Sequence, residues 1–228
     1  MTNLGRGPAR VIAPLAALVA LAGCSSAGHP ARPASAASPA AASTAMADRA
    51  ALAQLRRAET VLAGVRSFRF DATQTVAETK PLTTSEAGSV VRAQGVAYTL
   101  TVGRVRTQTI RLRAATYVRQ VPGKWLRLRK PRPLADPTRT LAAVLRTITA
   151  LHSAGANTVA AQLPPVAAAA AGIPVGSSPA QVTLTFDRLG HVTRLLVRTA
   201  TPVQGSDIAV TLVTSYWSFD RVPALRAP

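Results

Sequence analysis

The chain has 228 residues, and its 27 lysine and arginine residues against 9 aspartate and glutamate residues give a formal net charge of +18 at pH 7. A single cysteine excludes an internal disulfide, so the folded part must be stabilised by its hydrophobic core. A charge of this size favours anionic partners such as phospholipid headgroups, acidic wall polymers or nucleic acid. All but three of the basic residues are arginine and alanine is very frequent, so we interpret part of the excess as compositional bias.

Residues 1–23 have the features of a secretory signal peptide. Arg6 and Arg10 precede an uncharged apolar run from Val11 to Ala22, which is too short to span a bilayer. The run closes in Leu21-Ala22-Gly23-Cys24, which resembles the lipobox of bacterial lipoproteins. That resemblance implies a diacylglyceryl group on the Cys24 thiol and cleavage before this residue. The alternative is an ordinary signal peptide that is cleaved later, near residues 34–36.

The lipobox reading predicts where the protein is located. Two or more acyl chains, such as palmitate, make a stable membrane anchor. We therefore expect a cell-membrane lipoprotein on the outer face of the cytoplasmic membrane, a place where nucleic acid is not a partner. Residues 24–46 are rich in alanine, serine and proline and predict a disordered tether. The folded domain is then expected over residues 47–228.

The first folded element predicted is a helix over Ala47–Val65. Asp48 is suited to cap its start, and Gly64 is suited to stop it. Apolar residues recur at helical spacing, which predicts one buried face. These residues are Leu52, Leu55, Ala58 (or Glu59) and Leu62.

After the helix the apolar period changes to two, which predicts strands with one apolar face. The alternation begins at Phe68 and returns at Val96, Ile110 and Leu126. Turn signals separate these segments at Lys80-Pro81, Val102-Gly103 and Pro122-Gly123. The pattern is typical of an antiparallel meander.

A second helix is predicted to begin at Asp136-Pro137, a capping residue followed by a proline suited to the first turn. Its apolar stripe continues to Leu151, with Gly155 as the expected end. A short alanine helix is predicted over 166–171. Strands are then expected from Val182, over 192–200 and over 207–219.

The order of these elements resembles the LppX/LprAFG family of bacterial lipoproteins, which share the LolA-like fold. The segments that carry the resemblance are Val65-Arg66-Ser67-Phe68, Tyr117-Val118-Arg119, Gly123-Lys124-Trp125, Asp136-Pro137, Phe186-Asp187-Arg188-Leu189-Gly190 and Tyr216-Trp217-Ser218-Phe219. The resemblance covers residues 47–228. It implies an α+β fold in which a curved antiparallel β-sheet, a half-barrel, has helices packed on its concave face.

The resemblance also implies a function. Members of the family carry lipids, glycolipids or acyl chains within the cell envelope, so the expected partners are a lipid or glycolipid ligand and a membrane transporter. The predicted cavity lining consists of Phe68, Phe70, Val96, Tyr98, Leu100, Ile110, Leu112, Leu141, Val144, Leu145, Ile148, Val182, Leu184, Phe186, Val210 and Leu212. Alternation alone does not distinguish a cavity lining from a solid core, and both readings stay open.

One segment departs from the family pattern. Family members have a strand built around a glycine-containing hairpin before the strand that begins here at Val182. Residues 160–171 are mostly alanine with two adjacent prolines. We expect the strand to be lost or replaced by the short helix.

A run of basic residues extends from Ala87 to Ala135 without a single acidic residue. Several arginines are two apart, which predicts pairs on one face of a strand. The predicted basic surface consists of Arg104, Arg106, Arg111, Arg113, Arg127 and Arg129. It is either a solvated convex face or a surface that attracts an anionic membrane.

Catalysis has little support in the sequence. The histidines, His29, His152 and His191, show no metal-ligand spacing, and we find no nucleophile elbow or phosphate-binding glycine loop. We expect no enzyme, no metal and no cofactor. The prediction is a lipid-binding lipoprotein, and the alternative is an envelope sensor or scaffold domain that uses the same fold to bind a protein.

Overall fold

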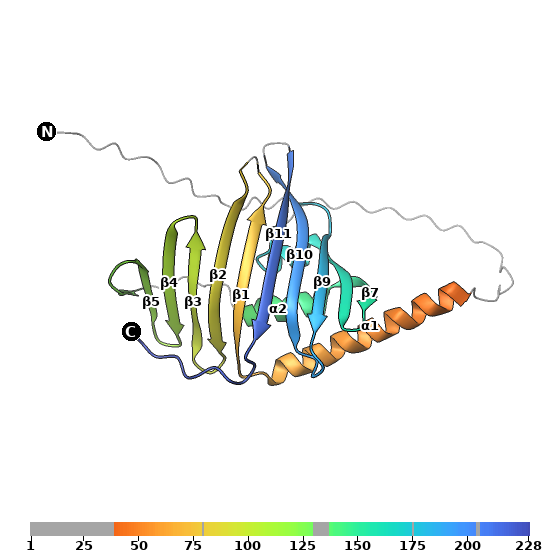
Figure 1. The fold of residues 1–228 in the computed structure, drawn as a ribbon, viewed down its shortest axis with the longest axis horizontal. Coiled ribbons are helices and arrows are strands. Elements are labelled where there is room, and N and C mark those ends of the chain that lie inside the picture. Colours follow the sequence, from red (N-terminus) through yellow and green to blue (C-terminus); the bar gives the residue numbers. More distant parts are fainter. Residues whose placement is uncertain (1–38, 79, 130–136, 175, 204–205) are drawn as a thin grey trace, which may run out of the picture. The chain divides into compact units, whose positions relative to one another are not determined.

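The computed structural model describes residues 39–78, 80–129, 137–174, 176–203 and 206–228 (Figure 1). The predicted signal peptide, Cys24 and most of the predicted tether lie outside these ranges. Within these ranges, no helix combines the length and the apolar character needed to cross a membrane.

The described residues form one antiparallel sheet of eleven strands in the order β6-β5-β4-β3-β2-β1-β11-β10-β9-β8-β7. The first six strands are β1 (Ser67–Val76), β2 (Leu82–Val91), β3 (Gly95–Val102), β4 (Val105–Leu112), β5 (Thr116–Val121) and β6 (Leu126–Leu128). The other five are β7 (Thr149–Gly155), β8 (Thr158–Leu163), β9 (Ala180–Phe186), β10 (Val192–Val203) and β11 (Ser206–Trp217). Pairing of β1 with β11 joins two meanders into the single sheet. The sheet is open, and the predicted α+β class with a curved antiparallel sheet is confirmed.

Helix α1 (Pro39–Gly64) buries one face against the sheet. Ala51, Leu55, Ala58 and Leu62 form that face, whereas Leu52 is 38% exposed, so the predicted stripe was wrong at this residue. The buried positions follow the spacing i, i+4, i+7, i+11, which holds one line on a helix of 3.6 residues per turn. The helix begins at Pro39 and thus extends into the range predicted as a tether.

Helix α2 (Pro137–Thr147) lies in the connection between the two edge strands β6 and β7. In Figure 1 it is seen between β1, β11 and β10, on the far side of the sheet. The predicted helix through Leu151 was wrong, because the chain turns at Ile148 and Thr149–Gly155 forms β7. Ala150 has a φ of 48°, a left-handed backbone that breaks the helical course.

The predicted loss of a strand before Val182 was also wrong. The hairpin β7–β8 is present, and Gly155 lies at its turn. In β8, Val159, Ala161 and Leu163 are buried while the residues between them are more exposed. Ala161 therefore still fits the inward-facing position of a strand, because its small side chain packs into the core. The predicted alanine helix is confirmed as α3 (Pro165–Ala170).

Candidate functional site

The helices pack on the sheet face that carries Phe68 and Phe70, which we call the inner face. The pairing register extends this face strand by strand. In β1, β11, β10, β9 and β8 its apolar residues pack with α1, α2 and α3 into one core. Leu184, Leu195, Val197, Val159 and Leu163 are at most 1% exposed. We call these five strands the covered half, and they leave no space for a ligand at those side chains.

The inner face is different in β2–β6, which we call the open half. The register places Val90, Val96, Arg111 and Thr116 in one row across β2, β3, β4 and β5. Half-buried Tyr98 and buried Thr109 pair in the next row. Polar and charged groups thus share this face with apolar ones.

Exposed apolar side chains gather on the open half. The exposed large hydrophobic residues on its inner face are Leu82, Val102, Val105, Leu126 and Leu128. Among these five residues Leu126 is the most exposed, at 66%. In Figure 1, α2 is seen behind β1, β11 and β10 but not behind β3–β5. The open half therefore presents apolar surface that the helices of the described residues do not bury.

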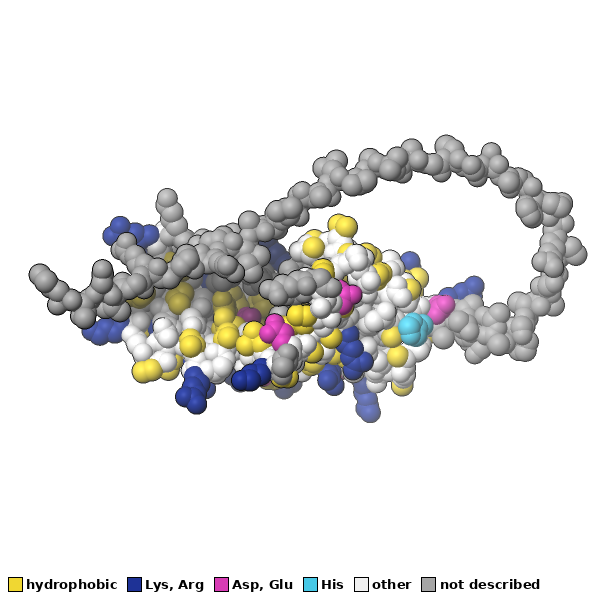
Figure 2. Space-filling view, turned by 90° about the horizontal axis from the view of Figure 1, so that it is seen from above, with side chains coloured by type: hydrophobic (Ala, Val, Ile, Leu, Met, Phe, Trp, Pro, Cys, Tyr) yellow, Lys and Arg dark blue, Asp and Glu magenta, His cyan; other side chains and the backbone are white. Residues whose placement is uncertain are grey.

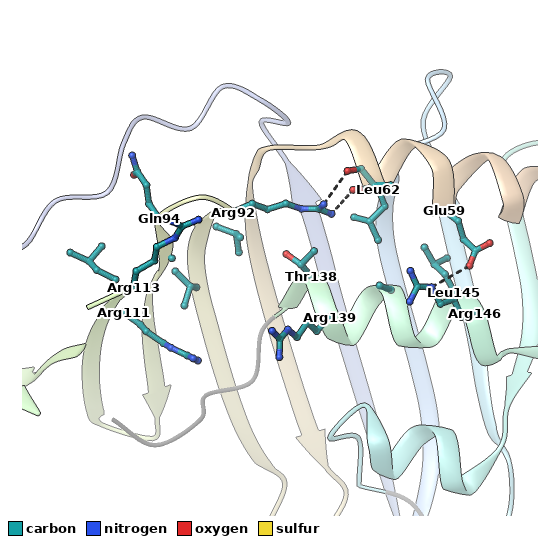
Figure 3. A pocket seen from close by; sticks show the side chains of 16 residues that line it. Glu59, Leu62, Arg92, Gln94, Arg111, Arg113, Thr138, Arg139, Leu145 and Arg146 are labelled. Atoms are coloured by element: carbon teal, nitrogen blue, oxygen red, sulfur yellow. Dashed lines mark hydrogen bonds and ion pairs between the residues drawn. The ribbon is translucent and has the colours of Figure 1, made fainter. Parts of the chain in front are cut away.

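A pocket of about 770 Å³ lies where the helices meet the open half. Its helical wall comes from the end of α1 and from α2, and its other wall comes from β2, β3 and the end of β4 (Figure 3). The apolar lining consists of Leu62, Ala63, Val90, Val96, Leu112, Ala142 and Leu145. The charged lining consists of Glu59, Arg92, Arg111, Arg113, Arg139 and Arg146.

Arg92 fixes the end of α1 at the pocket wall. Its guanidinium donates to the carbonyl oxygens of Ala63, at 3.0 Å, and of Leu62. Both acceptors lie in the last turn of α1, where carbonyls lack helical partners and a cation is favoured. The residue thus holds the helix against the turn after β2.

The other charged groups come from different elements. Arg146 on α2 lies 3.9 Å from the Glu59 carboxylate on α1, a partly exposed ion pair. Figure 3 shows Arg111 and Arg139 facing the pocket from β4 and α2, on opposite sides. At the rim, the Gln94 side-chain oxygen accepts a hydrogen bond from the Leu225 amide at 2.6 Å, which holds the C-terminal segment there.

Burial changes the acidity of two groups in the open half. It raises the pKa of the Glu86 carboxyl, and it also raises the pKa of Tyr98, which bonds to Thr109 and lies near Glu86 and Arg111. Water is thus partly excluded from this part of the inner face.

The predicted cavity residues mostly form a solid core. In the covered half and the helices, the buried members are Phe68, Phe70, Leu141, Val144, Leu145, Ile148, Val182, Leu184, Phe186 and Val210. Leu212 is partly buried against the same core. Only Val96, Leu112 and Leu145 of the predicted set line the pocket. Tyr98 and Leu100 lie on the open inner face beyond it.

Two predicted cavity residues, Ile110 and Leu112, lie at the alternate positions of β4, which do not share the inner face with Arg111. Ile110 pairs with Ala97, whereas Arg111 pairs with Val96. The reason is the hairpin turn, in which Gly103 and Arg104 form a two-residue loop that pairs Val102 with Val105. The turn sets the register, and a shift of one residue would exchange the two faces.

The predicted basic surface does not lie on one face. Arg106 and Arg127 lie on the outer face, but Arg111 lies on the inner face and lines the pocket. The residues outside the strands are Arg104, Arg113 and Arg129. Figure 2 shows basic side chains at several separate places on the side in view. Attraction of the outer arginines to an anionic membrane stays a prediction.

Sequence reasoning missed Arg92, Arg139 and Arg146 as pocket residues. Their signal was weak because each stands in or beside an apolar element among many other arginines. In the described part of the chain, no cluster of three histidine, cysteine, aspartate or glutamate residues is arranged to hold a metal.

Comparisons with known proteins concern the fold. No protein-family model and no curated protein matches the chain. The structure is similar to the crystal structure of LprF from Mycobacterium bovis, with a TM-score of 0.58 and 13% identity, over 79% of this chain and 97% of that chain. The predicted resemblance is thereby confirmed for the fold, which is of the LprF type.

Two further structures are more distant. The Mycobacterium tuberculosis lipoprotein LppX matches with a TM-score of 0.42 and 11% identity, over 78% of this chain and 100% of that chain. The MucA/MucB complex of Pseudomonas aeruginosa matches with a TM-score of 0.30 and 15% identity, over 72% of this chain and 57% of that chain.

Proposed function

We propose that this protein is a lipid-anchored envelope protein that binds an amphiphilic lipid or glycolipid in the pocket and carries it within the envelope. The observation that carries the proposal is a 770 Å³ pocket beside the open half, whose inner face also carries exposed apolar side chains. Pockets for small molecules have volumes of about 300–1,000 Å³. Acylation of Cys24, and with it a place on the outer face of the cytoplasmic membrane, belongs to the proposal because that residue lies outside the described ranges.

The driving force would be burial of acyl-chain methylenes, about 0.8 kcal/mol for each one. Leu62, Val90, Val96 and Leu145 supply apolar contacts inside the pocket. Val105, Leu126 and Leu128 supply further contacts across the open half. A chain on this surface would cover side chains that otherwise stand in water.

The two histidines in the described part of the chain, His152 and His191, lie apart from the pocket lining, which supports the proposal of a binding protein. The His191 Nδ1–H group donates to the Asp187 carboxylate at 2.8 Å, and the His191 ring stacks on Phe219 with 4.2 Å between the ring centroids. These contacts tie the β9–β10 turn to the C-terminal segment, and neither group lines the pocket. His152 is exposed on β7, away from the pocket lining.

The exposed apolar surface also favours a second candidate, an envelope scaffold that binds a protein partner on the open half. Edge strand β6 carries Leu126 and Leu128 and has an unpaired edge among the described strands. An unpaired strand beside apolar residues is a common docking place for another chain.

One experiment separates the candidates. The processed protein is extracted from its host membrane and examined by native mass spectrometry, and any bound molecule is then extracted and weighed. Ala142→Trp fills the pocket from α2, and Thr147→Trp places the same side chain on the exposed end of α2 as a control. We expect a co-purifying lipid with the wild type and the control but not with Ala142→Trp. An apo mass for all three, unchanged after incubation with envelope lipid, would favour the scaffold.

A further inference from the structure

Three turns at one end of the open half each carry an exposed basic residue. Strands β1–β6 pair antiparallel in chain order, so the β1–β2, β3–β4 and β5–β6 turns lie at the same end of the sheet. Figure 1 shows the first two of these turns at its upper end. Lys80, Arg104 and Lys124 lie in the three turns and are exposed. In the described part of these turns the only carboxylate is that of Glu78, so positive charge is in excess.

Exposed apolar side chains stand beside the same turns. Leu82 begins β2, and Val102 and Val105 flank the β3–β4 turn; each of the three is 39–50% exposed. The register places them on the inner face, because Val102 pairs with Val105 and with Thr84, which lies two residues after Leu82. We call the basic and apolar residues together the turn rim: Lys80, Leu82, Val102, Arg104, Val105 and Lys124.

The two kinds of side chain adjoin each other on the surface. Figure 2 views the sheet from this end, and on its left part hydrophobic and basic side chains lie next to one another. Apolar groups that stand in water beside a basic border are typical of a surface that docks on a partner. The partner should therefore offer both an apolar layer and negative charge.

An anionic lipid bilayer offers both. Apolar side chains gain free energy when they leave water for the boundary between headgroups and acyl chains, and each basic side chain is attracted to anionic headgroups. The long stems of lysine and arginine let the charge reach the headgroups while the stem covers apolar surface. A protein partner would need carboxylates opposite three separate turns, whereas headgroups present negative charge along the whole end of the sheet.

We propose that the turn rim docks on an anionic bilayer surface. Leu82, Val102 and Val105 contact the boundary of the acyl chains, and the three basic residues of the rim bind lipid phosphates. The pocket lies at the other end of β2–β4, where Val96 and Leu112 line it, so neither the pocket nor its ligand takes part in this contact. Docking thus determines which end of the domain faces the membrane.

The test uses the processed protein with one added cysteine that carries the fluorophore NBD. Cys24 is the single native cysteine, and its acylation, or its removal with a leader cleaved later, leaves the added thiol as the only reactive one. Val105→Cys places the label in the turn rim. Leu189→Cys is the matched control, an exposed apolar residue in the β9–β10 turn at the opposite end of the sheet.

Each labelled protein is placed on vesicles of phosphatidylcholine, alone or mixed with phosphatidylglycerol. Emission that shifts to shorter wavelength and is quenched by nitroxide-labelled lipid reports docking. For Val105→Cys we expect the ratio of docked to undocked protein to be at least about tenfold higher on mixed vesicles, because three basic side chains each gain from the anionic surface. High salt should reduce this difference. The label at Leu189→Cys should stay in water on both kinds of vesicle.

Variants of the Val105→Cys protein separate the turn rim from overall charge. Removal of the three basic residues should lower the docked ratio at least about tenfold, through Lys80→Gln, Arg104→Gln and Lys124→Gln. The control removes the same charge from exposed outer-face residues of β1 and β10 and should leave the ratio unchanged, through Arg69→Gln, Arg194→Gln and Arg198→Gln. Leu82→Ser with Val102→Ser should also lower the ratio. Circular dichroism checks that each variant is folded.

Several results would overturn the proposal. Equal signals from the Val105 and Leu189 labels, or equal losses in the two triple variants, would show that the turn rim has no special contact with the bilayer. A signal at Val105 that follows the number of protein molecules per vesicle, and not the anionic lipid, would assign this face to a second copy of the chain. Each of these results leaves lipid binding in the pocket untouched.

Discussion

The covered half and the open half of the sheet have the same alternating strands but different surroundings. In β8–β11 and β1 the inner side chains meet helices and are almost wholly buried, as for Leu184 and Leu195. In β2–β6 the same face carries Arg111, Glu86 and exposed leucines. The pocket lies where one half passes into the other. We therefore expect stability to depend mainly on the covered half and the proposed ligand to contact the open half.

The largest expected effect is a loss of stability from the covered half. Leu184→Ala removes a side chain that is 0% exposed and should lower the free energy of unfolding by about 2–5 kcal/mol. Leu100→Ala in the open half removes a half-buried side chain and should cost clearly less. Urea denaturation measures both. Equal losses would show that the two halves do not differ in packing.

A second prediction concerns the close approach of β3 and β4 at the pocket. Gly95 has a φ of 147°, and an added Cβ would stand 1.8 Å from the Arg111 carbonyl oxygen. Gly95→Ala should destabilise the fold by at least about 1–3 kcal/mol, because the backbone must shift. At Gly64 an added Cβ meets nothing within 4 Å, so Gly64→Ala is the matched control. A thermal melt in which both variants behave alike would contradict the register at Gly95.

The third prediction tests the link between the helices and the open half. Arg92→Met removes the two hydrogen bonds to the end of α1 while keeping an apolar stem. We expect a loss of about 1–3 kcal/mol, since the carbonyls of α1 lose a charged donor. Hydrogen exchange should speed up in the last turn of α1 but not in β9. Uniform protection in both places would mean that this contact does not hold the helix.

The smallest effect concerns pH. Because burial raises the pKa of Glu86, the unfolded chain ionises at lower pH than the folded one. The contribution of Glu86 is therefore fully present below its ordinary pKa of 4.5 and is lost as pH rises through the folded-state pKa. Glu86→Gln should remove this decline and make the protein slightly more stable at neutral pH. A stability profile over pH 4–8 that is unaltered by the change would refute the burial of this carboxyl.

Sequence reasoning worked best where burial is complete. The alternation Val182, Leu184, Phe186 predicted β9, because one face of this strand is buried in the core and the other face carries polar residues. It failed at Ile148, where the apolar stripe predicted for the second helix continues into β7. Apolar residues at helical spacing do not by themselves show where a helix ends. The left-handed backbone at Ala150 has no signature in residue type.

The candidate site was less accessible to prediction for a definite reason. We assigned Ile110 to the interior because it is apolar, yet it lies on the outer face of β4, in the half of the sheet where the inner face is only partly buried. The Gly103-Arg104 turn determines instead which residues of β4 face inward. Counting from that turn places Arg111 opposite Val96. Local turn geometry outweighs hydrophobic pattern wherever burial does not enforce the pattern.

The most direct measurement is photocrosslinking of a lipid that carries a diazirine near the middle of its acyl chain, followed by peptide mapping. We expect adducts on the end of α1, on α2 around Ala142, and on the inner face of β2–β4. Adducts should be absent from Leu184 and Val197, which the helices bury. Adducts confined to outer-face residues of β4–β6, or spread without preference over both halves, would contradict the claim that the open half and its pocket hold the ligand.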